Sequence, residues 1–172
     1  MKQEKVIEYR VEALDAKHDR AGFHCGVPEL DKYFHSQAGQ DARRHAAACY
    51  VLVDKASSVV GYYTLSAYGL NLAELPEHLI KKLPRYPRLP ATMLGRLAVS
   101  SSFRGQGLGR VLLLDALDRS WKHAAGVASI GVVVHALDDA ARQFYLHHEF
   151  QPLRDHPNKL LLWMATIQKM FQ

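Results

Sequence analysis

The sequence predicts a single mixed α/β domain in which helices cover a sheet. The chain has 172 residues, a length that suits one domain with a core of its own. Its apolar content of 48% and charged content of 23% are typical of a globular protein. Strand-like segments come first, and strand-like and helical segments then alternate to the end of the chain.

The first half of the chain predicts two strand regions separated by a helix. Alternating apolar residues over 6–14 indicate a strand. Apolar residues at helical spacing over 28–44, with proline at the first position, predict a helix. Two β-branched and aromatic segments, 49–54 and 59–66, flank a polar turn and predict a hairpin. A short helix over 76–83 then leads into an extended, proline-rich connection.

In the second half, strands and helices are predicted in strict alternation. They are a strand over 92–99, a long helix over 107–124, a buried strand over 130–134, a helix that continues to His147 and a last strand over 159–167. The long helix has two apolar faces, which places it between other elements. Asp138 or Asp139 is expected to cap the helix that ends at His147.

Cysteine content and hydropathy exclude several classes of protein. Cys25 and Cys49 are the only cysteines, so neither a disulfide framework nor a four-cysteine zinc site is possible. The first residues are charged and lack the apolar stretch of a signal peptide. The longest apolar run, 160–165, is far shorter than the ~20 residues that span a bilayer. We therefore expect a cytoplasmic protein that does not enter a membrane.

Positive charge is concentrated in one stretch of the chain. Seven of the 22 basic residues lie between His78 and Leu114, whereas all 17 acidic residues lie elsewhere. The seven are Lys81, Lys82, Arg85, Arg88, Arg96, Arg104 and Arg110. Such a stretch attracts polyanions and repels polycations. The alternative is a solvated basic face without a partner.

A glycine-rich turn connects the predicted strand that ends at Val99 to the long helix. It reads Arg104, Gly105, Gln106, Gly107, Leu108 and Gly109, and Arg110 follows it. The first amides of a helix have no partner within the helix, and together with the helix dipole they bind anions such as phosphates. Glycines tolerate positive φ and let a phosphate approach the backbone, while the flanking arginines add charge-assisted contacts. The alternative is a turn without a ligand.

The spacing of this turn distinguishes among phosphate ligands. A mononucleotide P-loop requires Lys and then Ser or Thr after its last glycine, where this chain has Arg110. A dinucleotide fingerprint places its third glycine one residue later. The pattern Arg-x-x-Gly-x-Gly instead resembles the acyl-CoA pyrophosphate loop of the GNAT N-acetyltransferases.

The resemblance to this family implies a fold and a cofactor site. The fold is a single domain, 1–172, with a mixed, mostly antiparallel central sheet flanked by helices and an acyl-CoA-binding core over 95–150. One central strand pair splays apart, with the segment 130–134 as the splayed neighbour. The freed backbone then binds the pantetheine arm of acetyl-CoA as if it were an added strand. The implied pantetheine contacts are Leu97, Ala98 and Val99, and the implied phosphate contacts are Arg104, Gly105, Gln106, Gly107, Leu108, Gly109 and Arg110.

Further blocks resemble a narrower group, the acetyltransferase toxins of toxin–antitoxin pairs. These blocks are 95–99, 105–109, 134–138, Phe144-Tyr145, Phe150, the turn Phe23-x-Cys25-Gly26 and the basic stretch 83–87. Members of that group acetylate the α-amine of aminoacyl-tRNA and so block translation. The resemblance implies a small ribbon–helix–helix antitoxin as partner, and a homodimer.

One position departs from the family pattern. Acetyltransferases commonly have glycine before the phenylalanine that follows the penultimate helix, where this chain has Glu149 before Phe150. A left-handed helix end would cost glutamate about 1 kcal/mol. We therefore expect a different helix cap here, with the carboxylate exposed.

Tyr145 is the candidate catalytic residue. The resemblance implies that this tyrosine lies near the sulfur of CoA, where a phenol, protonated at pH 7, protonates the leaving thiolate. Without the resemblance, a packing role beside Phe144 is the simpler reading. A backbone amide of 97–99 is the candidate donor to the thioester oxygen. A general base is dispensable, because an α-amine has a pKa of roughly 7.7–8.0 and is partly neutral at pH 7.

Other reactive side chains point to no second chemistry. His147, His148 and His156 lack partners at metal-ligand spacing, so no metal is expected. His135 follows a predicted strand near the expected cleft, where it either touches the substrate or is held by hydrogen bonds. Cys25 has a structural role in its turn rather than a nucleophilic one. The serines 100–102 lack the glycine elbow of a hydrolase.

The basic segment 78–104 indicates the acceptor. Beyond the two arginines assigned to the cofactor phosphates, five basic residues remain, which is more than one cofactor needs: Lys81, Lys82, Arg85, Arg88 and Arg96. They suit the backbone of a tRNA acceptor stem, while cationic acceptors would prefer an acidic cleft. Tyr86 either stacks on a terminal base or packs on the neighbouring prolines. The sequence thus predicts an aminoacyl-tRNA acetyltransferase toxin. The alternatives are an N-acetyltransferase for a small amine or a protein N-terminus, and a partner-binding module without activity.

Overall fold

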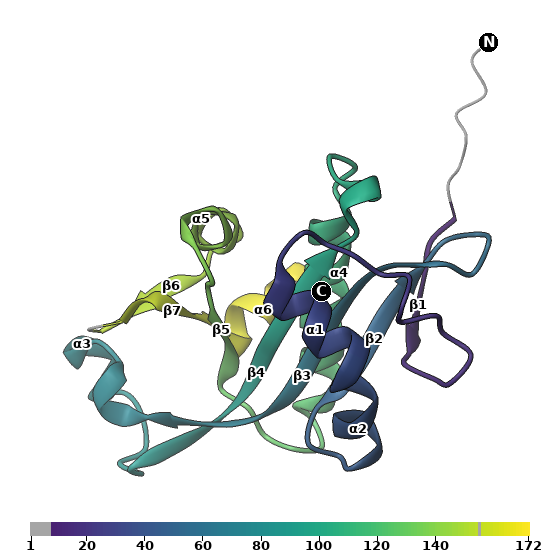
Figure 1. Ribbon diagram of the computed structural model, residues 1–172. Helices are drawn as coiled ribbons and strands as arrows, with labels where there is room; N and C mark the ends of the chain where they lie inside the picture. The colour runs from purple at the N-terminus through teal and green to yellow at the C-terminus, as the bar shows by residue number, and fades with distance from the viewer. Residues whose placement is uncertain (1–7, 155) are drawn as a thin grey trace. The chain divides into compact units, whose positions relative to one another are not determined.

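The computed structural model describes residues 8–154 and 156–172, which form strands and helices around one sheet (Figure 1). The strand order is β1-β2-β3-β4-β5-β7-β6. The pairs β1–β2, β2–β3, β5–β7 and β6–β7 are antiparallel, whereas β4 and β5 run parallel. The predicted class, helices with a mixed and mostly antiparallel sheet, is confirmed.

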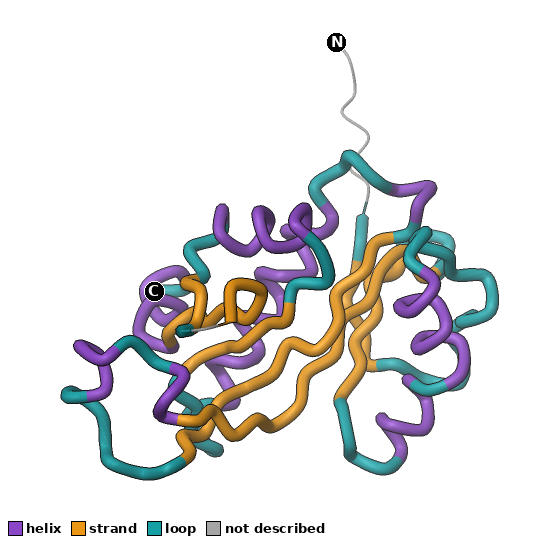
Figure 2. Tube along the Cα trace, turned by 60° about the vertical axis from the view of Figure 1, so that its left-hand side comes forward, coloured by secondary structure: helices purple, strands orange, loops and turns teal. Residues whose placement is uncertain are grey.

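The element bounds follow the predicted alternation of strands and helices, and β3 and β4 are the longest of the strands drawn orange in Figure 2. The strands are β1 (Arg10–Ala13), β2 (Ala48–Val53), β3 (Val59–Asn71), β4 (Arg88–Val99), β5 (Gly131–His135), β6 (Gln151–Leu153) and β7 (His156–Trp163). The α-helices are α1 (Pro28–Ser36), α2 (Ala38–Arg43), α3 (Glu77–Ile80), α4 (Leu108–His123), α5 (Asp139–His147) and α6 (Met164–Met170). Two short 3₁₀ turns are η1 (Leu72–Glu74) and η2 (Ser101–Phe103).

The chain divides into two compact units, each with its own core. The first comprises the chain up to Leu65 together with Arg96–Asp115, and the second comprises Ser66–Gly95 together with Ala116–Gln172. The boundaries between the two units fall inside β3, β4 and α4. Each boundary therefore lies within a strand or a helix and not in a loop.

In the first unit, α1 and α2 pack against the β2–β3 hairpin through an aromatic core. Phe23, Phe34 and Tyr62 are fully buried, with ring centroids of Phe34 and Tyr62 4.5 Å apart and those of Phe23 and Phe34 5.1 Å apart. The Tyr62 hydroxyl donates to the carbonyl of Leu30, so the buried phenol has a partner. The predicted hairpin and the proline at the first turn of α1 are both confirmed.

The single helix predicted over 28–44 is wrong, because the backbone bends at Gln37 and divides it into α1 and α2. Gln37 has φ −119°, away from helical values. Asp41 ties the two helices across the bend, since its carboxylate accepts from the Tyr33 hydroxyl at 2.7 Å and from the Gln37 amide at 2.9 Å. Apolar spacing alone does not report these side-chain bonds.

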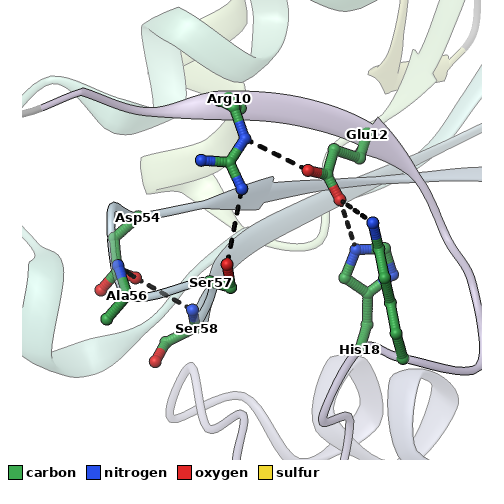
Figure 3. A network of polar contacts seen from close by, with 8 residues as sticks. Arg10, Glu12, His18, Asp54, Ala56, Ser57 and Ser58 are labelled. Carbon is green, nitrogen blue, oxygen red and sulfur yellow. Dashed lines mark hydrogen bonds and ion pairs between the residues drawn. The ribbon is translucent and has the colours of Figure 1, made fainter.

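The strand predicted over 6–14 is β1, which begins at Arg10; positions 6 and 7 lie outside the described residues. Glu12 on this strand accepts from Arg10, Lys17 and His18 (Figure 3). Hydrogen bonds from His18 and Lys17 hold the pKa of the Glu12 carboxyl at about 2. Because this folded-state pKa is depressed, the stabilisation it reflects is present above pH 4.5 and is lost as the pH falls toward 2.

In the second unit, β5 and β7 form the centre of an aliphatic core. Val133 and Leu161 pair across the two strands and pack with Leu70, Leu75 and Leu89. The register of β4 with β5 covers Thr92–Leu94 on the first strand and Val132–Val134 on the second. Asp138 caps α5, as predicted, by accepting from the amide of Ala141 at 2.8 Å.

The last strand predicted over 159–167 is wrong in its second part. β7 ends at Trp163, and Met164 begins α6, whose Ile167 is fully buried. The amide of Met164 donates to the carbonyl of Ile130, which turns the chain away from the strand direction. A continuous apolar run is compatible with a buried strand or a buried helix, so periodicity does not separate them. The three-residue strand β6, which contains Pro152, was not predicted.

Candidate active site

The glycine-rich turn lies where the sequence predicts it, between η2 and the first turn of α4. Gly105 has φ +78° and Gly107 has φ +74°, a conformation that favours glycine. Apart from the glycine and its two chain neighbours, no heavy atom of the described residues lies within 4 Å of a Cβ built at either position. The glycines are therefore required by the backbone conformation and not by crowding, and this leaves the N-terminus of α4 open to a ligand.

Contacts within the first unit hold this turn in place. The guanidinium of Arg104 donates to the carbonyl of Cys25, and a Cβ at Gly26 would meet the Arg104 Nη2 atom at 3.1 Å. A second contact to the turn comes from Tyr9, whose hydroxyl donates to the Gln106 side chain at 3.0 Å. Sequence reasoning assigned Arg104 to phosphate alone and missed its role in joining the two turns. The sequence feature that could have indicated this contact is the glycine after Cys25, because Gly26 adopts φ +86°, a conformation that favours glycine.

The strand before the turn is packed closely against β3. Ala98 is buried, and Leu97 and Val99 are half-buried. A Cβ at Gly61 would lie 3.0 Å from the Ala98 carbonyl oxygen and 2.8 Å from a Leu112 methyl group. Gly61 therefore permits the approach of β3 to the strand segment predicted to bind pantetheine, a role that sequence reasoning missed.

Tyr145 lies on α5 in the second unit and is 7% exposed. Its ring meets Phe144 at a centroid distance of 5.2 Å and Phe150 at 5.3 Å, both edge to face. Burial raises the pKa of the phenol well above its ordinary value, so the hydroxyl keeps its proton at neutral pH. The side chain is therefore packed among aromatic rings and protonated at neutral pH, which is the form that a proton donor requires.

The end of α5 contradicts the prediction of an unusual cap, because Glu149 adopts the left-handed conformation with φ +71°. The amide of Phe150 donates to the Tyr145 carbonyl, and that of Glu149 donates to Leu146, which together make a Schellman motif. The accompanying apolar contact is Phe150 against Tyr145. The predicted exposure of the carboxylate is confirmed. This cap fixes the side chain of Tyr145 at the cost of backbone strain.

Four of the five basic residues assigned to the acceptor lie together in sequence after α3 and at the start of β4. Lys81, Lys82, Arg85 and Arg88 are all exposed. Tyr86 among them is 61% exposed, which favours stacking on a partner over packing on the prolines. Arg96 belongs to the first unit, where its guanidinium stands 3.4 Å above the centroid of Tyr33.

The remaining reactive candidates have structural surroundings. Burial and the neighbouring Asp31 raise the pKa of the Cys25 thiol to about 11, and its amide donates to Asp31, which confirms the structural role predicted for it. His148 bonds the carbonyl of Phe144 through Nδ1 at 2.8 Å. Across residues 8–154 and 156–172, no three His, Cys, Asp or Glu side chains gather as a metal site. The helices in that same part of the chain are too short or too polar to cross a bilayer.

This strand, open turn and helix N-terminus, on this order of elements, define an acyltransferase fold. The chain belongs to the acetyltransferase (GNAT) family, whose model matches residues 11–150. The predicted family is therefore confirmed on a match that includes the whole glycine-rich turn and Tyr145.

Relatives and solved structures are similar over nearly the full chain. A probable toxin TacT of Sinorhizobium fredii is 32% identical over 93% of both chains. A tRNA-acetylating toxin of Mycobacterium tuberculosis is 34% identical over 88% of this chain and 90% of its own. The structure of AtaT complexed with acetyl-methionyl-tRNAfMet has a TM-score of 0.88 at 31% identity, covering 96% of this chain and all of that one. AtaTR bound with AcCoA has a TM-score of 0.84 at 31% identity, covering 95% and 98%.

Replacing Glu149 with glycine tests the strain at the end of α5. We expect E149G to be more stable to unfolding than the matched variant E149A by about 1 kcal/mol, because only glycine relieves the left-handed backbone. Urea unfolding of both variants, followed by circular dichroism, measures the difference. Equal stability of the two variants would show that the conformation carries no strain.

Proposed function

We propose that this protein transfers the acetyl group of acetyl-CoA to the α-amine of aminoacyl-tRNA and thereby inhibits translation. The observation that carries the proposal is similarity at about 30% identity, over nearly the whole chain, to the tRNA-acetylating toxin and to AtaT. The open helix N-terminus and the exposed basic segment 78–104 support a phosphate-bearing donor and a polyanionic acceptor. The whole chain, 1–172, acts as one N-acetyltransferase domain with its acyl-CoA-binding core over 95–150.

Acetyl-CoA supplies the thioester. The backbone of Leu97, Ala98 and Val99 holds its pantetheine arm. The amides of the turn 105–109 and the exposed Arg110 hold its pyrophosphate, because glycines at positive φ leave the backbone accessible. Arg104 shapes the turn through Cys25, which leaves Arg110 as the main charge toward phosphate. The bound form of AtaTR with AcCoA is consistent with this donor.

The reaction needs one new bond and one proton for the leaving group. The neutral amine attacks the thioester carbon, the C–S bond breaks, and the thiolate takes the phenolic proton of Tyr145. The new amide nitrogen releases one proton to solvent, and Tyr145 regains one from solvent, so the enzyme is restored. Burial among Phe144 and Phe150 keeps that proton on the phenol until the thiolate forms. A backbone amide of 97–99 stabilises the charge on the carbonyl oxygen.

Phosphate contacts to the acceptor come from Lys81, Lys82, Arg85 and Arg88, with Tyr86 as a surface for base stacking. Arg96 already stands over Tyr33 in the first unit, so we assign it a smaller part in this surface than the sequence predicted. We further propose that a cognate ribbon–helix–helix antitoxin neutralises the protein, that the protein works as a homodimer in the cytoplasm, and that no metal takes part. AtaT complexed with the C-terminus of its antitoxin AtaR supports an antitoxin partner.

Labelled acetyl-CoA identifies the acceptor. Total bacterial tRNA is offered in charged form in one tube and in deacylated form in the other. We expect label on charged tRNA alone, because only charged tRNA carries an α-amine. Binding of acetyl-CoA with label on neither sample would contradict the proposal and favour a small amine or a protein N-terminus as acceptor.

Y145F tests the proton donor. We expect its turnover to fall roughly 100-fold or more, the usual contribution of a general acid, while acetyl-CoA binding stays near the wild-type level. Y62F is the matched control, since it also removes a buried phenol hydroxyl but leaves α5 intact. Turnover equal to wild type in Y145F would remove this residue from the mechanism.

Charge removal tests the tRNA surface. Replacing Lys81, Lys82, Arg85 and Arg88 with glutamine is expected to raise the KM for charged tRNA and to flatten its salt dependence, because each phosphate contact releases counterions. Acetyl-CoA affinity, measured by calorimetry, is expected to stay unchanged.

The control removes the same number of charges from exposed positions outside this segment: Lys32, Arg44, Lys55 and Lys169. A fall in acetyl-CoA affinity in the first variant, or an equal KM effect in both, would contradict the assignment of the basic segment to tRNA.

A further inference from the structure

The second unit contains an open cavity of about 440 Å³. Its lining consists of His135, Ala136, His156, Pro157, Asn158 and Lys159. The volume lies within the range of roughly 300–1,000 Å³ that small-ligand pockets occupy. The amide of Ala136 donates to the carbonyl of Asn158 at 2.7 Å, which ties the end of β5 to β7 and fixes the two walls.

An ion pair supports one wall of this cavity. The Lys159 ammonium lies 2.7 Å from Glu74 Oε1, and the two side chains are only 12% and 13% exposed. Lys159 also stands 4.9 Å from the ring centroid of Tyr68. His156 approaches the same Glu74 oxygen at 3.7 Å. Such a well-packed pair holds a cation at the cavity in one position, because both partners have lost most of their water.

The second carboxylate oxygen of Glu74 is buried, and within the described residues it has no hydrogen-bond partner. A buried acceptor without a partner is unusual in a folded protein. The oxygen belongs to the side chain that binds Lys159. Glu74 lies outside the lining of the cavity, so it holds the Lys159 cation from behind the wall.

His135 is the last residue of β5, directly across from Lys159 in the β5–β7 register, and it is accessible to solvent. Loss of water around the ring and the nearby Lys159 and His156 lower the pKa of His135, while Glu74 raises it. The net direction is downward from the usual value of 6.5, so the imidazole is neutral at pH 7 and has a nitrogen that accepts a proton.

We propose that this cavity receives the aminoacyl end of the acceptor and that His135 accepts the proton lost by the α-amine. The inference rests on the proposed function and adds a base to it. As the N–C bond forms, the amine proton passes to His135, and the C–S electrons leave with the thiolate that Tyr145 protonates. His135 returns its proton to water through the open mouth of the cavity. The fixed Lys159 cation favours the neutral, nucleophilic form of an amine placed beside it.

A short stretch of chain connects His135, the proposed base, to the helix that carries Tyr145, the proposed acid. Residues 136–138 connect His135 to α5, the helix that carries Tyr145, and all of them lie in the second unit. The bond from Ala136 to Asn158 and the Asp138 cap hold the two ends of this short connection. The predicted dispensability of a base rested on the α-amine, which is partly neutral at pH 7. The fold nevertheless brings an imidazole to the cavity.

The test compares H135Q with the control H147Q, which changes an exposed histidine of α5 outside the cavity. We expect H135Q to lower kcat/KM for charged tRNA about 100-fold at pH 7, with the deficit shrinking as the pH rises and solvent replaces the base. Binding of acetyl-CoA is expected to be unchanged, and H147Q is expected to behave as wild type. Added imidazole is expected to restore part of the activity of H135A.

The outcomes separate this inference from the proposed function. If wild type acetylates charged tRNA and H135Q has the same rate and pH profile, the role of His135 is overturned and the proposed function stands. A slow H135Q whose deficit is the same at every pH, with no imidazole rescue of H135A, indicates a structural role and also overturns the inference. If wild type labels no charged tRNA, both fall together.

Discussion

The backbone at the start of α4 is the constraint on which the proposed acetyl-CoA site depends. The first amides of a helix have no partner within it, and here glycines at positive φ, with open space around their Cα atoms, come just before Leu108. Contacts with a distant turn support this loop. Arg104 donates to the carbonyl of Cys25, 79 residues earlier in the chain, and the amide of Ser101 donates to the carbonyl of His24.

In the second unit, burial and fixed charge shift the pKa values of two side chains. Tyr145 is kept protonated by desolvation, and its position is secured by a Schellman cap that forces Glu149 into a left-handed conformation. In the same unit, Glu74 holds the Lys159 ammonium near His135. Loss of water and the nearby Lys159 lower the pKa of that imidazole, while Glu74 raises it. A protonated phenol and a neutral imidazole are the forms in which the proposed acid and the proposed base would act.

Charge distinguishes the two sites proposed above. The glycine-rich turn offers backbone amides and few charges, whereas the exposed segment after α3 carries a dense set of cations that would suit a polyanion. Arg96 belongs to neither set of residues, because its guanidinium stacks on Tyr33 at the core of the first unit. The similarity to toxins that act on tRNA agrees with this division, since a compact thioester donor and a long phosphate backbone need different surfaces.

Local chemistry in the sequence determined most of the strands and helices, the hairpin, the Asp138 cap and the glycine-rich turn, because each depends on residues within a few positions of one another. Only the tertiary structure decided where the helix breaks at Gln37, where the apolar run after Leu160 turns from strand to helix, and that Arg104 serves Cys25. It also brought Glu74 to Lys159, 85 positions along the chain. These features depend on contacts between distant segments, which periodicity and spacing along a sequence do not encode.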